Sequence, residues 1–174
     1  MEFPDPTLAL LVATAALNVG HVAVHVMTTL VRKGPDLPWY DAWVGYLGAL
    51  AWFGMVIVDR GTLGLTWQVT MPLGLLLTGA GLYVHGKGIR HIMVHGGDGA
   101  LVTQGIYARL RHPIYYGWVT VSFGLPLVTG SWWGLLTAPL WSGLILLIGR
   151  MEEWDMRRRF PDGAYDEYLQ TTWF

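Results

Sequence analysis

The sequence contains no cysteine and few charged residues. The absence of cysteine among 174 residues excludes disulfide bonds, thiolate metal sites and cysteine nucleophiles. Charged residues make up only 13% of the chain, whereas roughly 25% is usual for soluble domains. The net charge of −1 provides no basic surface for nucleic acid. We therefore expect no nucleic-acid partner.

The few charges also leave long apolar stretches. No Asp, Glu, Lys or Arg occurs within residues 6–31, 42–58, 61–86 and 113–149. A transmembrane helix needs about 17–25 mostly apolar residues, so each of the first three stretches is long enough to cross once. The fourth can cross twice if it turns at Gly130-Ser131. The alternative is a soluble protein with buried core helices, but such helices rarely run so long without charge.

The sequence thus predicts one all-α integral membrane domain over residues 1–174. We expect a bundle of about five transmembrane helices, with spans at about residues 6–31, 41–58, 66–89, 114–128 and 133–149. A tail over residues 150–174 should begin as a charged helix, break at 161–163 and continue as a short helix through Tyr165 and Tyr168.

The basic residues predict the orientation of the bundle. With five spans and the N-terminus outside, ten of the eleven Lys and Arg residues lie on the cytoplasmic side, and only Arg60 lies outside. Short cytoplasmic loops collect Lys and Arg. We therefore expect a multi-pass protein, of a prokaryotic plasma membrane, with the N-terminus outside and the C-terminus in the cytoplasm.

The stretch Arg109-Leu-Arg-His-Pro-Ile-Tyr-Tyr-Gly117 stands where a cytoplasmic loop enters the fourth span. Pro113 disfavours helical geometry at His112 and suits the first position of a helix, so a helix should begin here. Its unpaired N–H groups and positive dipole end, with Arg111 and His112, predict a clamp for a carboxylate or phosphate. A basic stop at a membrane boundary explains the arginines but not the His-Pro-x-Tyr-x-Gly pattern.

A pair of adjacent carboxylates, Glu152-Glu153, follows the fifth span. Adjacent helical residues point about 100° apart, so one carboxylate can face the bundle and the other the solvent. A carboxylate in a half-buried pocket can bind ribose hydroxyls, an ammonium group or a cationic sulfur. The alternative is a solvated helix in which Glu153 pairs with Arg157.

Together these motifs resemble the superfamily of isoprenylcysteine carboxyl methyltransferases and phospholipid methyltransferases, over about residues 75–170. The resemblance rests on Leu101-Val-Thr-Gln-Gly-Ile-Tyr107, Arg111-His-Pro-Ile-Tyr115-x-Gly117, and Glu152-Glu153 with Phe160, Tyr165 and Tyr168. It implies a membrane-embedded, S-adenosylmethionine-dependent methyltransferase whose fold differs from that of soluble Rossmann methyltransferases. The implied acceptor is lipid-like or a small hydrophobic molecule at the cytoplasmic interface, with membrane lipids as further partners.

The resemblance also implies a site formed by the loop, the start of the fourth span and the tail. The implied cofactor-binding residues are Leu101, Val102, Gly105, Tyr107, Arg111, His112, Pro113, Tyr115, Gly117, Glu152 and Glu153. Arg111 and Glu153 are the catalytic candidates, and no metal is expected. Because the fourth and fifth spans form a hairpin, the Arg111-His112 and Glu152-Glu153 pairs should be neighbours, with the tail covering the cofactor.

Other functions stay open at this point. Membrane sterol reductases share a related Arg-His-Pro element and bind a nicotinamide cofactor, although their chains are much larger. A non-enzymatic haem or metal carrier would use the histidines His21, His25, His85 and His91. His21 and His25 share one helix face, where they could also make an interhelical contact or line a substrate channel.

Glycines recur in the third span. Gly74, Gly79, Gly81 and Gly86 resemble a cofactor-proximal stretch of phospholipid methyltransferases. Small residues also let membrane helices approach closely, so helix packing explains them equally well.

Overall fold

The structure is a computed structural model and describes residues 5–27, 38–96 and 99–173. The described part is all-α, which confirms the predicted fold class. Its helices are α1 (Pro6–Val26), α2 (Pro38–Val58), α3 (Trp67–His95), α4 (Pro113–Thr129), α5 (Trp132–Arg159) and α6 (Ala164–Thr171), with a short 3₁₀ helix, η3, at Gly105–Ala108.

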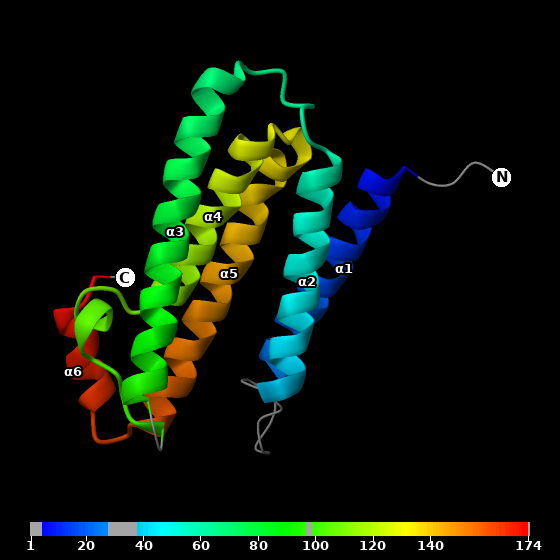
Figure 1. The fold of residues 1–174 in the computed structure, drawn as a ribbon. Helices are drawn as coiled ribbons and strands as arrows, with labels where there is room; N and C mark the ends of the chain where they lie inside the picture. Colours follow the sequence, from blue (N-terminus) through cyan, green and yellow to red (C-terminus); the bar gives the residue numbers. More distant parts are fainter. Residues whose placement is uncertain (1–4, 28–37, 97–98, 174) are drawn as a thin grey trace.

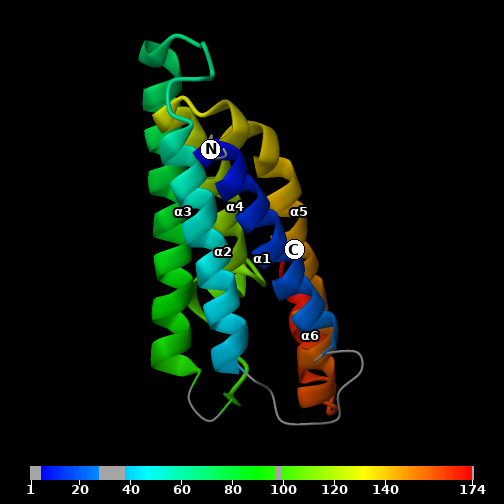
Figure 2. The same cartoon turned by 90° about the vertical axis from the view of Figure 1, so that its right-hand side faces the viewer.

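The five long helices run up and down in an elongated bundle (Figures 1 and 2). Helix α1 packs on α2, and α4 packs between α3 and α5. The end of α3, the start of α4, the end of α5 and the whole of α6 lie at one end of the bundle. The loop before α4 and the tail after α5 therefore meet there, as the predicted site requires.

The outside of the bundle is apolar. Large hydrophobic side chains such as Leu76 and Val69 are more than 60% exposed. Within the described residues, α1, α3 and α5 contain segments long and apolar enough to cross a membrane, and α2 has a shorter apolar segment at Gly45–Val58. Helix α4 has only 17 residues, but much of it is buried against its neighbours. These features are those of a helical membrane protein.

Helix α3 extends beyond its predicted end, and α5 joins the predicted fifth span to the predicted charged helix of the tail. Helix α3 continues past residue 89 to His95, and α5 continues without a break from the apolar span into the charged segment as far as Arg159. Arg, Lys and Glu are good helix formers, so leaving the apolar region does not end a helix. The ends come instead at Gly96 and before Pro161. The predicted first span reaches residue 31, but residues 28–31 lie outside the described part.

The predicted turns at Gly130-Ser131 and at 161–163 are confirmed. Gly130 adopts a left-handed conformation (φ 67°) at the end of α4. The hydroxyl of Ser131 then accepts a hydrogen bond from the Gly134 N–H (2.9 Å) at the start of α5. Gly163, also left-handed (φ 87°), precedes α6, which contains Tyr165 and Tyr168 as expected.

Glycines let α3 and α4 pack with their backbones in close contact. The contact glycines are Gly74, Gly81 and Gly88 in α3 and Gly117 and Gly124 in α4. A Cβ atom on Gly81 would lie 2.6 Å from the carbonyl oxygen of Gly117, and one on Gly117 would lie 2.6 Å from that of Gly81. Gly79 and Gly86 face open space. Close packing therefore accounts for Gly74 and Gly81, and it fixes the start of α4 against α3.

The opposite end of the bundle is held by Asp59, which is buried at the end of α2. Its carboxylate accepts hydrogen bonds from the Ser131 hydroxyl (2.7 Å) and the Trp133 N–H (2.8 Å). A carboxylate at the N-terminus of α5 is favourably placed for the helix dipole. Asp59 thus ties α2 to the α4–α5 turn.

Candidate functional site

The Arg111-His112 pair and the Glu152-Glu153 pair lie next to each other at the end of the bundle where α4 begins. The Nε2 atom of His112 lies 3.2 Å from an oxygen of Glu153, and its Nδ1 atom lies 3.5 Å from an oxygen of Glu152. The Arg111 guanidinium lies 3.6 Å from Glu153. The expected pairing of Arg111-His112 with Glu152-Glu153 is confirmed.

The start of α4 places His112. Pro113 is the first helical residue and is fully buried, and His112 just before it has a non-helical backbone conformation (φ −126°, ψ 57°). Proline fits this position because its missing N–H would have no partner in the first turn. Gly88 of α3 leaves room for Pro113 and Ile114, since a Cβ atom there would lie 3.2 Å from Pro113. His112 is thereby directed toward α5.

Glu153 faces the bundle and Glu152 is half exposed, as the helix geometry predicted. Glu153 is only 4% exposed and also accepts a hydrogen bond from Arg150 (3.1 Å). Burial alone would raise the pKa of Glu153, but the hydrogen bonds from Arg150 and His112 outweigh it and hold the pKa below its ordinary value. Glu153 is therefore ionised at neutral pH. Arg157 pairs with Asp166 (2.9 Å), so the alternative Glu153–Arg157 pair is wrong.

Arg111 holds the C-terminal tail, a role that the sequence did not predict. Its Nε atom donates to the Thr172 hydroxyl (3.0 Å), and its Nη2 atom donates to the carbonyl oxygens of Leu169 (2.7 Å) and Thr172 (3.2 Å). Leu169 and Thr172 belong to no motif, and carbonyl acceptors leave no trace in a sequence. The remaining nitrogen, Nη1, lies near Glu153. Arg111 therefore acts as a latch, which means that it holds the tail against the start of α4, and it is not an open site for an anion.

Tyrosines fasten the tail to the loop before α4. The Tyr168 hydroxyl donates to the carbonyl oxygen of Tyr107 (2.7 Å), and the Trp173 N–H donates to that of Arg109 (2.9 Å). Tyr107, Tyr165 and Tyr168 are all buried. Burial raises the pKa of Tyr168 to about 12 and raises the pKa values of the other two tyrosines as well. The tail is thus packed against the loop before α4, beside this end of the bundle (Figure 1).

Two cavities flank Tyr115. The first, here called the charged cavity, has a volume of about 630 Å³ and is lined by Arg111, His112, Arg150, Glu153 and apolar residues of α5. The second, here called the aromatic cavity, has a volume of about 460 Å³ and is lined by residues of all five long helices. Tyr115 lines both, and Glu152 lines the aromatic cavity.

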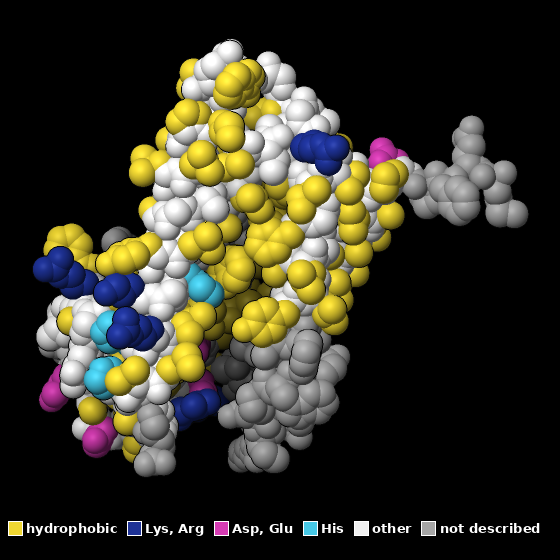
Figure 3. Space-filling view, viewed as in Figure 1, with side chains coloured by type: hydrophobic (Ala, Val, Ile, Leu, Met, Phe, Trp, Pro, Cys, Tyr) yellow, Lys and Arg dark blue, Asp and Glu magenta, His cyan; other side chains and the backbone are white. Residues whose placement is uncertain are grey.

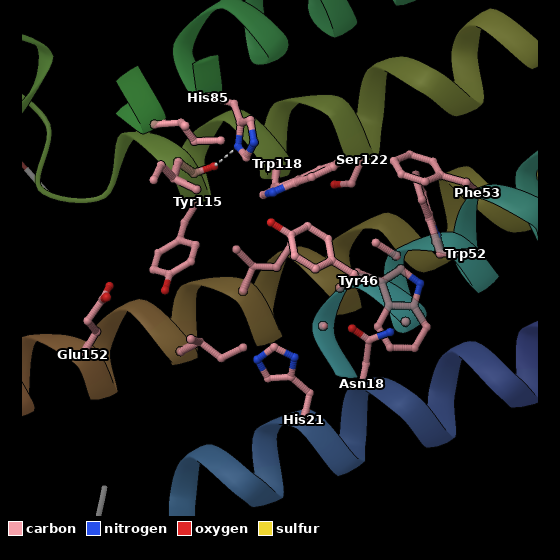
Figure 4. Close-up of a pocket in the computed structure, with 18 residues that line it drawn as sticks. Asn18, His21, Tyr46, Trp52, Phe53, His85, Tyr115, Trp118, Ser122 and Glu152 are labelled. Atoms are coloured by element: carbon pink, nitrogen blue, oxygen red, sulfur yellow. Dashed lines mark hydrogen bonds between the residues drawn. The ribbon is translucent and has the colours of Figure 1, made fainter. Parts of the chain in front are cut away.

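The aromatic cavity lies between the α1–α2 pair and the α3–α5 group. Figure 3 shows the surface hollowed there, and Figure 4 shows His21, Tyr46, Trp118 and His85 around one space. His21 lies in the same cavity as Tyr115, which fits the open alternative that it lines a substrate channel. The sequence could not place His21 beside the motif because nothing in it fixes how α1 is rotated against the other helices.

The remaining predicted site residues line neither cavity. Leu101, Val102, Gly105 and Tyr107 lie in the loop, and Pro113 and Gly117 face α3. Gly105 is left-handed (φ 61°) and lies against the His91 ring, where a side chain would overlap it. These residues support the loop and the start of α4. Their direct contact with a cofactor stays a prediction.

A haem or metal carrier would need its histidines to lie close together. Among the described residues, no group of three or more His, Asp or Glu side chains is arranged to hold a metal ion. His91 packs on the loop while His85 and His21 line the aromatic cavity, and the side chain of His25 lies outside the described part.

Comparison with known families settles the class of protein. The sequence model of the phospholipid methyltransferase family matches residues 69–163, more than half of the chain. The chain belongs to the phospholipid methyltransferase family. No curated protein and no solved structure matches it. The matched region contains most of α3, the whole of α4 and α5, and the polar cluster formed by Arg111, His112, Glu152 and Glu153. It confirms the resemblance inferred from the motifs. Family membership makes the chain a membrane methyltransferase.

Proposed function

We propose that this phospholipid methyltransferase family protein transfers a methyl group from S-adenosylmethionine to a lipid-like or small hydrophobic acceptor at the cytoplasmic membrane interface. One observation carries the proposal: a charged cavity and an aromatic cavity meet at Tyr115. The first suits a polar cofactor, and the second suits a hydrophobic acceptor. Both volumes fall within the range of about 300–1,000 Å³ that is common for small-molecule sites.

The side chains of the charged cavity fit the functional groups of S-adenosylmethionine. Arg150 is 73% exposed and can bind the carboxylate, a role that we move from Arg111 because the tail occupies the donors of Arg111. The ionised Glu153 suits a ribose hydroxyl or a positively charged group. Leu146 and Leu147 give the cavity an apolar wall for the adenine ring.

S-adenosylmethionine supplies a methyl group that is already activated by its positively charged sulfur. The protein therefore needs mainly to align the acceptor and exclude water. Tyr115 stands between the cavities, stacked at 5.6 Å on the His112 ring. The tail, latched by Arg111, shields the cluster from the cytoplasm. The acceptor reaches the aromatic cavity from the bilayer, between α1–α2 and α3–α5.

We further propose that the polar cluster lies in the cytoplasm and that the Asp59 end of the bundle lies outside. The distribution of basic residues supports this orientation. Because the chain lacks cysteine, single substitutions report the topology cleanly. Thr62→Cys should react with an impermeant maleimide in intact cells, and Gln104→Cys should react only after lysis. Labelling of Gln104→Cys in intact cells would refute the orientation.

Methyl transfer is tested by incubating purified protein with a membrane lipid extract and methyl-labelled S-adenosylmethionine. We expect label in the organic phase with the natural chain, and a strong loss of label with Glu153→Gln. His95→Ala is the matched control, since His95 is exposed at the end of α3 and lines neither cavity. Equal labelling by all three proteins, or none with the natural chain, would contradict the proposal.

A further inference from the structure

His85 stands in the wall of the aromatic cavity, close to the start of α4. Its Nδ1 atom lies 3.2 Å from the carbonyl oxygen of Ile114, and its ring meets the Trp118 ring edge-on at 4.9 Å (Figure 4). A carbonyl oxygen can only accept a hydrogen bond, so Nδ1 must carry the hydrogen. In the neutral ring, the lone pair is then on Nε2. The fold thus fixes the tautomer of a histidine at the cavity wall.

The same cavity is lined by aromatic rings from three helices, namely Tyr46, Trp52, Phe53, Trp118 and Trp141. Such rings stack well on a flat ring. Among the described residues that line this cavity, Glu152 is the only carboxylate, and it lies 3.5 Å from His112. The walls therefore suit a flat aromatic molecule that packs against these rings.

These observations deepen the proposed function, on which the following inference rests. We propose that the aromatic cavity binds a lipophilic phenol as the methyl acceptor, and that His85 Nε2 accepts the proton of its hydroxyl group. Tyr115, which separates the two cavities, and His85 both line the space in which the hydroxyl would lie. The acceptor oxygen is then at the boundary with the charged cavity.

The O–H bond of the phenol breaks and its proton moves to His85 Nε2, while an oxygen lone pair forms the new bond to the methyl carbon. The electrons of the methyl–sulfur bond remain on the sulfonium sulfur, which leaves as a neutral thioether. The imidazolium then releases its proton to water. A phenol has a pKa of about 10 and is therefore mostly protonated at neutral pH, so a base is needed while the bond forms.

The inference is tested without any methyl donor, using 4-nitrophenol as the probe because its ionised form absorbs visible light. The probe is titrated with pH in the presence of detergent-solubilised protein, and protein-free detergent gives the reference. Beside the imidazolium that His85 forms, the bound phenol should ionise at a pH lower by about one unit or more than in protein-free detergent. We expect this shift with the natural chain and with the control His95→Ala.

Two variants isolate His85. His85→Phe keeps a ring against Trp118 but removes both nitrogens, and His85→Asn keeps a donor for the Ile114 carbonyl but has no basic nitrogen. Both should bind the probe and lose the shift, and both should slow methylation of a lipophilic phenol by about 10²–10⁴-fold. An unchanged shift in a variant that binds the probe, or no probe binding by the natural chain, would overturn the inference.

Cofactor binding separates this inference from the proposed function. If the natural chain binds S-adenosylmethionine but not the probe, or methylates a lipophilic amine in preference to the phenol, the phenol acceptor is wrong and methyl transfer stands. If it binds neither molecule, both proposals fail.

Discussion

Replacing Glu153 by Gln should destabilise the protein far more than the same change at Glu152. Glu153 is buried and faces Arg111 and His112, whose side chains are only 17% and 11% exposed. Removing one partner of a buried ion pair costs about 3–5 kcal/mol. Arg111 keeps its bonds to the tail, and the exposed Arg150 is screened by solvent, so we expect about 3 kcal/mol.

The matched control is Glu152→Gln. The side chain of Glu152 is 49% exposed and lies 3.5 Å from His112, and a pair of this kind contributes about 0.2–1 kcal/mol. Thermal unfolding in detergent should therefore show a drop of roughly 6–12 °C for Glu153→Gln. The drop for Glu152→Gln should be no more than about 4 °C.

The effect of Glu153 should also depend on pH. The pKa of Glu153 is lowered in the folded state, so its stabilisation is present above its ordinary value of 4.5 and is lost as the pH falls through the lower, folded value. The difference between the natural chain and Glu153→Gln should therefore shrink below pH 4.5. Equal drops for the two glutamate variants at neutral pH would refute this reasoning.

Three further predictions concern the tail and the helix contact. Deleting residues 161–174 should leave a helical bundle by circular dichroism but speed the release of S-adenosylmethionine in stopped-flow measurements, and unchanged release would mean that the tail is no lid. Gly81→Ala should destabilise the protein by about 1–3 kcal/mol in thermal unfolding, because the new Cβ atom would lie 2.6 Å from the Gly117 carbonyl oxygen. Gly79→Ala is the control and should leave the stability unchanged, because Gly79 faces open space. Burial raises the pKa of Tyr168 from 10 to about 12, so the stability of the fold should fall as the pH rises from 10 to 12. A tyrosinate absorbance titration measures this ionisation. If Tyr168→Phe leaves the titration unchanged, the burial of Tyr168 is contradicted.

Much of the fold follows from the sequence because the signals are long. Charge-free stretches fix where the membrane helices lie, and Pro113, Gly130 and Gly163 mark where elements begin or end. The end of α3 was less predictable than the end of α5, which Pro161 and Gly163 mark. Residues such as Arg90 in α3 and Arg150 in α5 are good helix formers, so the membrane boundary and the helix end do not coincide.

Contacts in the candidate site were predictable where both contacting residues belong to sequence motifs. The meeting of His112 with Glu153 follows from two motifs joined by one hairpin. The latch between Arg111 and the tail was not predictable, because its acceptors are mostly backbone carbonyl groups. The aromatic cavity was also missed, since its walls come from five helices whose rotations depend on packing.

We propose that the polar cluster at the start of α4 holds S-adenosylmethionine. Isothermal titration of the detergent-solubilised protein with S-adenosylmethionine, with NADPH in a parallel titration, tests it most directly. We predict saturable binding of S-adenosylmethionine, its strong weakening by His112→Ala, its retention in His95→Ala, and no binding of NADPH. Binding of NADPH alone, or S-adenosylmethionine binding that His112→Ala leaves unchanged, would contradict the account.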